Sequence, residues 1–419
     1  MFPLNINKTE TLSEVFSYDI LKTSEQLIRK ETDLILEKNP SIRGIPIHDF
    51  NTFIGIEVEV EGLNMEKLPK LGPFWRLTED GSLRNNGGEF VSAPIRGYAI
   101  LAALQRLNEA LEASEKHDFS DRTSVHIHVN VRDMTCESFM NFLLVYLIFE
   151  STLYKYVFDS CNRKRDENIF CVPISKSGGK DLGLVQGLGY FHKGDNRAAL
   201  ATISQHWKKY TGINLVPIRS FGTAEFRQLG GTGNIKQILS WINLILSIKT
   251  YACTRTYDQI MERVGGLNTD SMYNMFTKEI FNKNADLILK YNVQRELEKG
   301  VIFVKYLMTT GAEQTEGFDM DAGFGESSLK DYIETSIGKK LKKAEARLKK
   351  NFSEFSEEEL ESELLYVNRV LEEIAVMYRA ALNPMDKEMH NNDYRAMFAE
   401  QKLVLDEMTQ RDNIKRRVK

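Results

Sequence analysis

Cysteine is scarce in this chain, and no two cysteines lie close together in the sequence. The 419 residues include four cysteines, Cys136, Cys161, Cys171 and Cys253, none of which forms a Cys-x-x-Cys motif. This spacing excludes the common cysteine-based zinc sites. It also provides no disulfide framework, which fits a reducing compartment.

Long apolar runs and targeting signals are also missing. The most apolar stretch, residues 139–149, contains Asn141 and ends next to Glu150, so it is too short to cross a bilayer. The N-terminus lacks the charged start, apolar stretch and small-residue cleavage site of a signal peptide. We therefore expect a cytoplasmic protein that does not bind a membrane.

Neither sign of charge dominates the sequence. The 55 basic and 59 acidic residues give a net charge of −4, so there is no overall attraction for nucleic acid. Two basic segments, residues 339–350 and 411–419, are interpreted as solvated helix faces, with contact to an acidic partner or nucleic acid as the alternative. The glycine-rich segment 230–233 lacks the Gly-Lys-Ser/Thr ending of a P-loop and predicts a turn into the next helix.

A strand-like segment near the start of the chain carries three acids on one face. Residues 53–61 alternate aliphatic residues with Glu57, Glu59 and Glu61, so the acids point one way and the aliphatics the other. Adjacent acids repel one another, and glutamate is a poor strand former. A bound divalent cation would compensate for both. A solvated outer strand face explains this segment equally well.

A second segment, residues 123–131, carries His126, His128 and Asn130 on one face and aliphatic residues on the other. A single histidine is more often a satisfied core or surface residue. Two histidines at alternate positions, in a chain with only seven, favour a site instead. Neutral imidazole binds divalent metals and donates to phosphate oxygens.

Two further segments add acids. Residues 221–227 place Glu225 and Arg227 on one face, for which a simple ion pair is the alternative explanation. The stretch around Asp80 predicts a turn followed by a short strand with Glu89, and an ordinary hairpin is the alternative there. Carboxylates with an imidazole suit Mg²⁺ or Mn²⁺ better than zinc, and a magnesium site with several carboxylates usually holds nucleotide phosphates as well.

In this order the motifs resemble those of the amidoligases, over residues 53–235. The matching stretches read G-x-E-x-E, D-x-S…E-F-V-S-x-P, S-V-H-I-H-V-N and K-Y…N-L…F-G-T-x-E-F-R. Amidoligases are carboxylate-amine ligases of the glutamine synthetase and glutamate–cysteine ligase superfamily, common in bacteria and phages. The resemblance implies an α+β fold in which helices pack against a curved antiparallel sheet of the glutamine-synthetase type, and it implies ATP with Mg²⁺ or Mn²⁺ as cofactors.

The resemblance also implies roles for individual residues. The metal ligands would be Glu57, Glu59, Glu89, His126 and Glu225. The catalytic residues would be Arg227, Glu225 and Asp80. The contacts to nucleotide phosphate or substrate would be His128, Asn130, Lys208 and Arg219, with Tyr210 and Asn214 as further substrate candidates. No counterpart in the family pattern is found for Glu61.

These features together predict an ATP-dependent ligase that joins a carboxylate substrate to an amine substrate through an acyl phosphate, forming an amide or isopeptide bond. A metal-dependent kinase or phosphohydrolase would use the same acids. A non-catalytic scaffold on a ligase fold is the third alternative. The clustered acids argue against it, because a scaffold has no need of mutually repelling carboxylates.

The sequence predicts three regions: a helical segment (1–50), a glutamine-synthetase-like catalytic domain (51–310) and a helical C-terminal region (311–419). Helical spacing is found at 12–36, at 98–111, at 138–158 and from 236 onward. The apolar stripe after Ser356 is typical of a core or of a seam for a protein partner or self-association. Residues 175–196, rich in Gly, Lys and Asp, predict a mobile loop, either a lid over the nucleotide or plain surface disorder.

Overall fold

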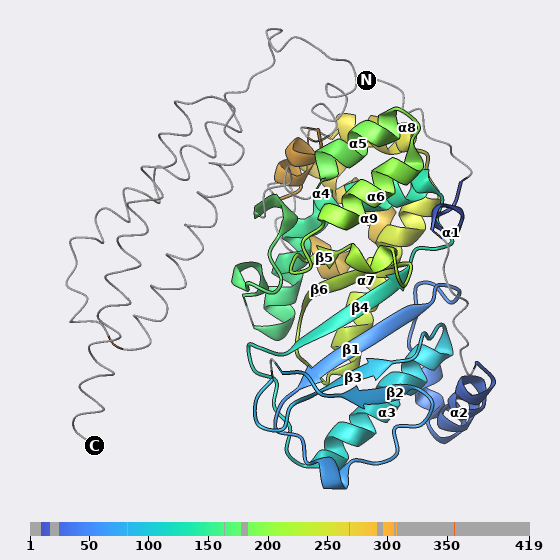
Figure 1. Ribbon diagram of the computed structural model, residues 1–419, viewed down its shortest axis with the longest axis vertical. Coiled ribbons are helices and arrows are strands. Elements are labelled where there is room, and N and C mark those ends of the chain that lie inside the picture. Colours follow the sequence, from blue (N-terminus) through green and yellow to red (C-terminus); the bar gives the residue numbers. More distant parts are fainter. Residues whose placement is uncertain are drawn as a thin grey trace. The chain divides into compact units, whose positions relative to one another are not determined.

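The computed structural model describes residues 10–16, 25–81, 83–162, 164–176, 183–267, 269–290, 296–305, 307 and 356 (Figure 1). The chain divides into two compact units, residues 1–318 and 319–419. All described residues except Ser356 belong to the first unit. The apolar stripe that follows Ser356 and both basic segments lie outside the described residues, and the three predicted regions stay predictions.

A six-stranded antiparallel sheet forms the centre of the first unit (Figure 1). Its strands are β1 (Ile54–Val60), β2 (Trp75–Thr78), β3 (Gly88–Ser92), β4 (Ser124–Asn130), β5 (Ile213–Asn214) and β6 (Thr223–Gly230). They lie side by side in the order β2-β3-β1-β4-β6-β5. The four segments predicted to carry acids or imidazoles are therefore the four inner strands. The two-residue strand β5 was not predicted.

Helices cover the aliphatic face of the sheet. The helices that do so are α3 (Tyr98–Ser114), α4 (Cys136–Cys161) and α7 (Ile235–Cys253). Phe226 of β6 shows the packing, because its ring meets Phe142 of α4 at 5.9 Å and Trp241 of α7 at 6.5 Å between centroids. On the other side of the sheet centre, Trp75 of β2 donates from Nε1 to the carbonyl of Ala103 in α3, at 2.7 Å. Helices packed on an antiparallel sheet confirm the predicted α+β class.

The longest described helix, α4, is a core helix. Its predicted extent was 138–158, and the helix begins slightly earlier, where Thr135 accepts the N–H of Ser138 as N-cap. Among the described residues it alone has the length and composition to cross a membrane, but 89% of its apolar window is buried inside the protein. Its Phe149 packs against Phe276 and Phe281, and this coverage accounts for a helix that is apolar almost all round.

The remaining helices surround this core. They are α1 (Leu12–Val15), α2 (Glu25–Lys38), α5 (Leu184–His192), α6 (Asn196–His206), α8 (Tyr257–Gly265), α9 (Asp270–Phe281) and α10 (Asp286–Leu289). Short 3₁₀ turns occur at η1 (Pro40–Gly44), η2 (Met65–Lys67), η3 (Arg165–Glu167), η4 (Ile174–Lys176), η6 (Val216–Ile218) and η7 (Asn282–Asn284). The helix predicted at 98–111 is α3. The turn predicted at 230–233 leads into α7, whose N-cap is Asn234.

The prediction of a mobile loop at 175–196 is wrong for the part of it that the structure describes. Residues 184–192 form α5, which packs against α6. Gly187 explains the error, because a Cβ at this position would come within 2.4 Å of Ile203 Cγ1. The glycines permit two helices to approach closely, and they were counted as loop formers. Residues 177–182 lie outside the described part of the chain.

Candidate metal centre

The strand register brings the predicted ligands together on the sheet face opposite the helices. Glu59 on β1 pairs with Glu89 on β3. Glu57, two residues earlier on β1, pairs with His126 on β4. His128, also on β4, pairs with Glu225 on β6. Since residues at alternate positions of a strand share a face, these pairs form a continuous diagonal row across four strands.

Arg227 shares this face with Glu225 by strand alternation, and a β-bulge on β6 changes the alternation after it. The register shifts between Val125 and Ile127 of β4, whose partners are Leu229 and Phe226. Two residues of β6, Arg227 and Gln228, therefore stand opposite one residue of β4. Phe226 and Leu229 both reach the core although they are three positions apart. Without the bulge, strand alternation would place one of them on the polar face.

His126 occupies the middle of the row and is almost completely buried. Its Nδ1 lies 3.2 Å from Oε2 of Glu57 and 3.5 Å from Oε1 of Glu225. Its Nε2 lies 3.9 Å from Oε1 of Glu59. One imidazole thus borders carboxylates from three sides, as expected for a residue that shares a cation with them.

Ser124 holds both Glu59 and His126, a role that the sequence analysis missed. The backbone N–H and the hydroxyl of Ser124 both donate to Oε2 of Glu59, at 2.7 Å each. The same hydroxyl lies 2.8 Å from Nε2 of His126. Ser124 precedes His126 by two positions and so shares its strand face. That spacing was the available signal.

His128 has one ring nitrogen held and one open. Its Nδ1 lies 3.0 Å from the hydroxyl of Thr223. Its Nε2 lies 3.2 Å from Oε1 of Glu57, and this buried nitrogen makes no hydrogen bond among the described residues. A histidine whose second nitrogen is fixed and whose first nitrogen faces a carboxylate has the usual arrangement of a metal ligand.

Glu225 and Arg227 form an ion pair, as the alternative reading of this strand suggested. Arg227 donates from Nη1 to Oε1 of Glu225, while Asn214 on β5 donates to Oε2 at 2.6 Å. Arg227 also donates to the carbonyl of Phe170, at 3.3 Å, and its guanidinium lies 5.9 Å from the ring centre of Tyr210. The pair is buried and fixed from several sides, which a surface ion pair would not be.

Three groups of side chains offer donor atoms within 4.8 Å of one another. These groups are Glu59 with Asp80 and Glu89, Glu57 with Glu89 and His126, and Glu57 with His128 and Glu225. Glu89 and Glu57 each belong to two groups, so the three form one row. The structure thereby brings together all five predicted metal ligands. It adds Asp80 and His128, which were predicted to act in catalysis and in cofactor binding.

The acids in the middle and at the β6 end of the row, Glu57 and Glu225, are ionised. Burial opposes ionisation of Glu57, but its contacts with His126 and His128 outweigh it and hold the pKa of Glu57 well below its usual range. Burial likewise opposes the charge of Glu225, yet the charges of His126 and Arg227 lower its pKa. Burial opposes protonation of His128 too, and its contact with Glu57 raises its pKa despite this.

Glu89 behaves in the opposite way. Burial together with the charges of Glu57, Glu59 and Asp80 raises the pKa of Glu89 to about 7. Its hydrogen-bond donor is the hydroxyl of Thr78, at 3.4 Å. The largest influences on this pKa are burial and negative charges. A bound cation would supply the missing positive charge.

Three residues predicted to contact nucleotide phosphate or substrate do not belong to the row. Asn130 donates from its amide to Asp133 at 3.1 Å and so stabilises the turn after β4. Lys208 is exposed in the connection before β5, and Arg219 is exposed at the end of η6. None of the three belongs to a potential metal-binding group of the described residues. Their roles stay predictions.

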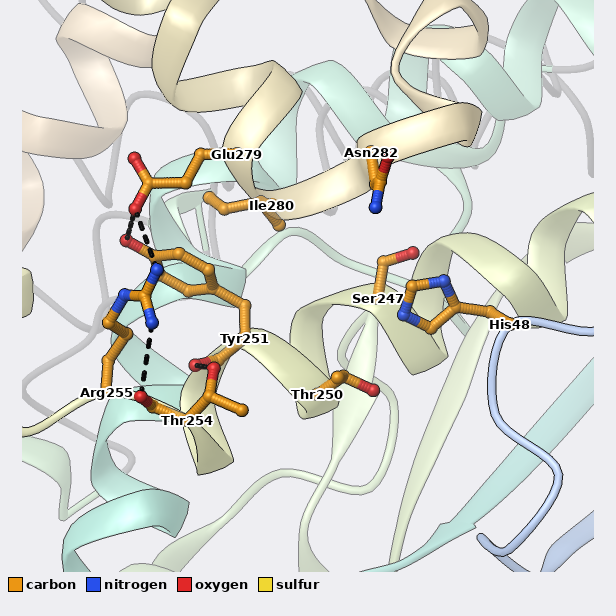
Figure 2. A pocket seen from close by; sticks show the side chains of 9 residues that line it. All are labelled: His48, Ser247, Thr250, Tyr251, Thr254, Arg255, Glu279, Ile280 and Asn282. Atoms are coloured by element: carbon orange, nitrogen blue, oxygen red, sulfur yellow. Dashed lines mark hydrogen bonds and ion pairs between the residues drawn. The ribbon is translucent and has the colours of Figure 1, made fainter.

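A small cavity lies away from this row, between α7 and α9 (Figure 2). It measures about 130 Å³ and is lined by His48, Ser247, Thr250, Tyr251, Thr254, Arg255, Glu279, Ile280 and Asn282. Figure 2 shows that Tyr251 and Arg255 both point to Glu279, which accepts hydrogen bonds from them at 3.3 and 3.4 Å. Its charged groups already satisfy one another, and none of its residues belongs to the row.

Comparison with known proteins agrees with this geometry. Residues 75–249 match the family model described as "Putative amidoligase enzyme". This part of the chain is similar to the amidoligase family. The match confirms the resemblance seen in the motifs and supports a ligase-type function. No curated protein and no solved structure matches the chain.

The matched region runs from β2 into α7. It contains Asp80, Glu89, all of β4 and Glu225, whereas Glu57 and Glu59 precede it on β1. Since β1 lies between β3 and β4, these two acids complete the row from outside the matched residues. The acids on β1 therefore belong to the same face as the family motifs.

Proposed function

We propose that this protein is an ATP-dependent carboxylate-amine ligase that uses Mg²⁺ or Mn²⁺ and forms an amide or isopeptide bond. The observation that carries the proposal is the row of three donor groups, joined through Glu57 and Glu89, with the Glu225–Arg227 pair at one end. An antiparallel sheet packed by helices on one face is compatible with a glutamine-synthetase-like fold. The need for ATP agrees with a cytoplasmic location.

The donor atoms fit hard divalent cations. Carboxylate oxygens dominate every group, and imidazole supplies the remaining donors. The buried Nε2 of His128 has no hydrogen bond among the described residues, and Glu89 lies among acids that raise its pKa. A cation would satisfy both. When bound, such ions neutralise and orient the phosphate oxygens of a nucleotide.

Arg227 is the residue that we expect to meet the transferred phosphoryl group or the acyl substrate. Its guanidinium is a rigid fork suited to phosphate and carboxylate oxygens. Glu225 and the carbonyl of Phe170 fix its orientation, so little reorganisation is needed when negative charge develops nearby. Tyr210 and Phe170, both partly exposed and in contact with one another, border the same side chain.

The proposed reaction has two steps. A substrate carboxylate oxygen attacks the γ-phosphorus of ATP, and ADP leaves, which gives an acyl phosphate. An amine nitrogen then attacks the acyl carbon, phosphate leaves, and the nitrogen loses a proton to give the amide. The negative charge of both steps falls on oxygens that Arg227 and the row can balance, so one site serves both.

ADP release tests the proposal. Purified protein with Mg²⁺ and ATP is screened against amino acids and polyamines, alone and in pairs of one carboxylate and one amine. Release of ADP that requires an amine, with formation of the amide seen by mass spectrometry, supports the ligase. Phosphate release that is independent of any amine indicates a phosphohydrolase. A stable phosphorylated product indicates a kinase.

A further inference from the structure

The third acid of the β1 segment, Glu61, is not used by the proposed function. Strand alternation places it on the same face as Glu57 and Glu59, and it is 5% exposed. It nevertheless belongs to none of the potential metal-binding groups found in the described part of the chain. Its Oε1 instead accepts the backbone N–H of Arg84, at 2.9 Å. This buried carboxylate therefore binds the backbone of a loop.

That loop, of which residues 79–81 and 83–87 are described, connects β2 to β3 and carries Asp80. Its second half is attached to the end of β1, because Gly62 donates its N–H to the carbonyl of Asn85 at 2.9 Å. Gly87 lies so close to β1 that a Cβ there would be 3.2 Å from the carbonyl oxygen of Val60.

The first half of the loop depends on the second. The N–H of Leu83 donates to the carbonyl of Asp80 at 3.2 Å. This hydrogen bond connects Asp80, the potential metal ligand, to the segment that Glu61 holds. Asn85 and Asn86 have φ angles of 52° and 57°, a left-handed conformation that costs free energy in residues other than glycine. Such a conformation persists where neighbouring contacts enforce it, and the Glu61–Arg84 hydrogen bond is one of these contacts.

We propose that Glu61 is a positioning residue: by accepting the N–H of Arg84 it holds the 79–87 loop so that Asp80 stays within reach of Glu59 and Glu89. This inference rests on the proposed function, because Asp80 matters as a donor only if the row binds cations. The N–H of Arg84 needs an acceptor oxygen at this position, which a carboxylate supplies and a side-chain amide oxygen can replace.

The test uses the full chain and Mn²⁺, with free Mn²⁺ measured by electron paramagnetic resonance. Glu61→Ala is expected to weaken one class of Mn²⁺ site by roughly tenfold or more, as Asp80→Asn does, because losing a residue that orients a ligand commonly has this effect. Glu61→Gln keeps an oxygen that accepts the N–H of Arg84, so it is expected to retain most of the affinity. Glu66→Ala removes an exposed carboxylate from the same corner and serves as the matched control.

Two further readouts separate positioning from ligation. Glu61→Ala combined with Asp80→Asn should bind Mn²⁺ no more weakly than Asp80→Asn alone, because both changes act on the same donor. Amide hydrogen exchange over 79–87, measured without metal, should become faster in Glu61→Ala and stay unchanged in Glu61→Gln and Glu66→Ala.

Several outcomes overturn the inference. Glu61→Gln binding as weakly as Glu61→Ala would make Glu61 a ligand or a required charge. Unchanged Mn²⁺ binding in Glu61→Ala would remove its role altogether. Should Glu61→Ala not fold, Glu61→Gln decides: retained Mn²⁺ affinity with wild-type exchange supports the inference, and loss of either contradicts it. Absence of Mn²⁺ binding in the wild type would instead refute the proposed function.

Discussion

Glu225 and Glu89 stand at opposite ends of the same row of donors, and their surroundings differ. Glu225 lies beside Arg227 and accepts the amide of Asn214, and its pKa is lowered. Glu89 lies among acids, with a hydroxyl as its hydrogen-bond donor, and its pKa rises to about 7. The β6 end carries its own counter-charge, whereas the largest charges acting on Glu89 at the β3 end are negative.

This difference separates two ways of building a cation site. At the β6 end, rigid partners on β5 and β6 hold the acid ionised before any ion arrives. At the β3 end, one donor comes from a loop, and the acids repel one another until a cation joins them. We therefore expect the β6 end to set activity through geometry and the β3 end to respond more strongly to ions and to pH.

The largest effect is expected at the preorganised end. Glu225→Gln keeps the side-chain shape but removes the charge that orients Arg227, and amine-dependent ADP release should fall about 10²–10³-fold, as for loss of one preorganised charge-stabilising group. Circular dichroism and the melting temperature check that the fold is retained, with Glu66→Gln as the exposed control. Activity close to that of the wild type would show that this end is only structural.

A second, smaller effect is expected between the two ends of the row. Ser124 holds Glu59 and touches His126, so Ser124→Ala frees both at once. We expect Mn²⁺ affinity to drop about 10–100-fold, the usual range for loss of a residue that orients metal ligands. Ser124→Thr keeps the hydroxyl and should recover part of the affinity. Equal affinities for wild type and Ser124→Ala would mean that the backbone N–H alone suffices.

For the β3 end we predict that Glu89→Gln changes the folding stability in opposite directions without and with a bound cation. Because the pKa of Glu89 is raised in the folded state, folding stability falls as pH rises from the unfolded value of 4.5 to about 7. Glu89→Gln lacks this loss, so without metal at pH 8 it should be more stable than the wild type by about 1–2 kcal/mol, after allowance for its partial exposure. That difference corresponds to roughly 3–6 °C in melting temperature.

The sign should reverse once a cation is present. With saturating Mn²⁺ the wild type gains stability by binding, and Glu89→Gln gains less. Well below pH 4.5 the metal-free difference should vanish, because the carboxyl is then protonated in both folded and unfolded chains. Glu225→Gln tests the comparison: its acid has positive partners, so this variant should be less stable than the wild type at pH 8. A gain in both variants would erase the distinction between the two ends.

The sequence predicts which residues share a strand face, but it does not predict the order of the strands in the sheet. Alternation placed Glu57 with Glu59 and His126 with His128, and period-two spacing suffices for that. Which strand lies beside which depends on tertiary packing, so the pairing of Glu57 with His126 could be argued only from the family resemblance. The bulge at Arg227–Gln228 was equally hidden, because it is created by the register between two strands distant in sequence.

Other misses have local causes. Glycine has two uses, and at Gly187 the one that applies is close helix packing rather than a loop. Ser124 shares the strand face of His126, but its contact with Glu59, 65 positions away, could not be seen from that spacing. Glu61 was grouped with its neighbouring acids by alternation, and only the path of the 79–87 loop distinguishes it. Each miss concerns a partner far away in the sequence.

The smallest predicted effect concerns the orientation of one ring. For His128 to offer Nε2 to a cation, its Nδ1 must carry the proton and donate to the hydroxyl of Thr223, 3.0 Å away. Thr223→Val removes the acceptor at nearly constant shape. The position is only half-buried, so a water can replace the hydroxyl, and we expect a loss of only about fivefold to tenfold in Mn²⁺ affinity.

Thr223→Ser provides the matched control because it keeps the hydroxyl and should bind Mn²⁺ like the wild type. The His128 ring signals in NMR spectra report the tautomer directly, and they should shift in Thr223→Val and not in Thr223→Ser. A change of tautomer without any change in affinity would show that His128 is outside the cation sites. The β6 end would then consist of Glu57 and Glu225 alone, and its preorganisation would come from Arg227 and Asn214.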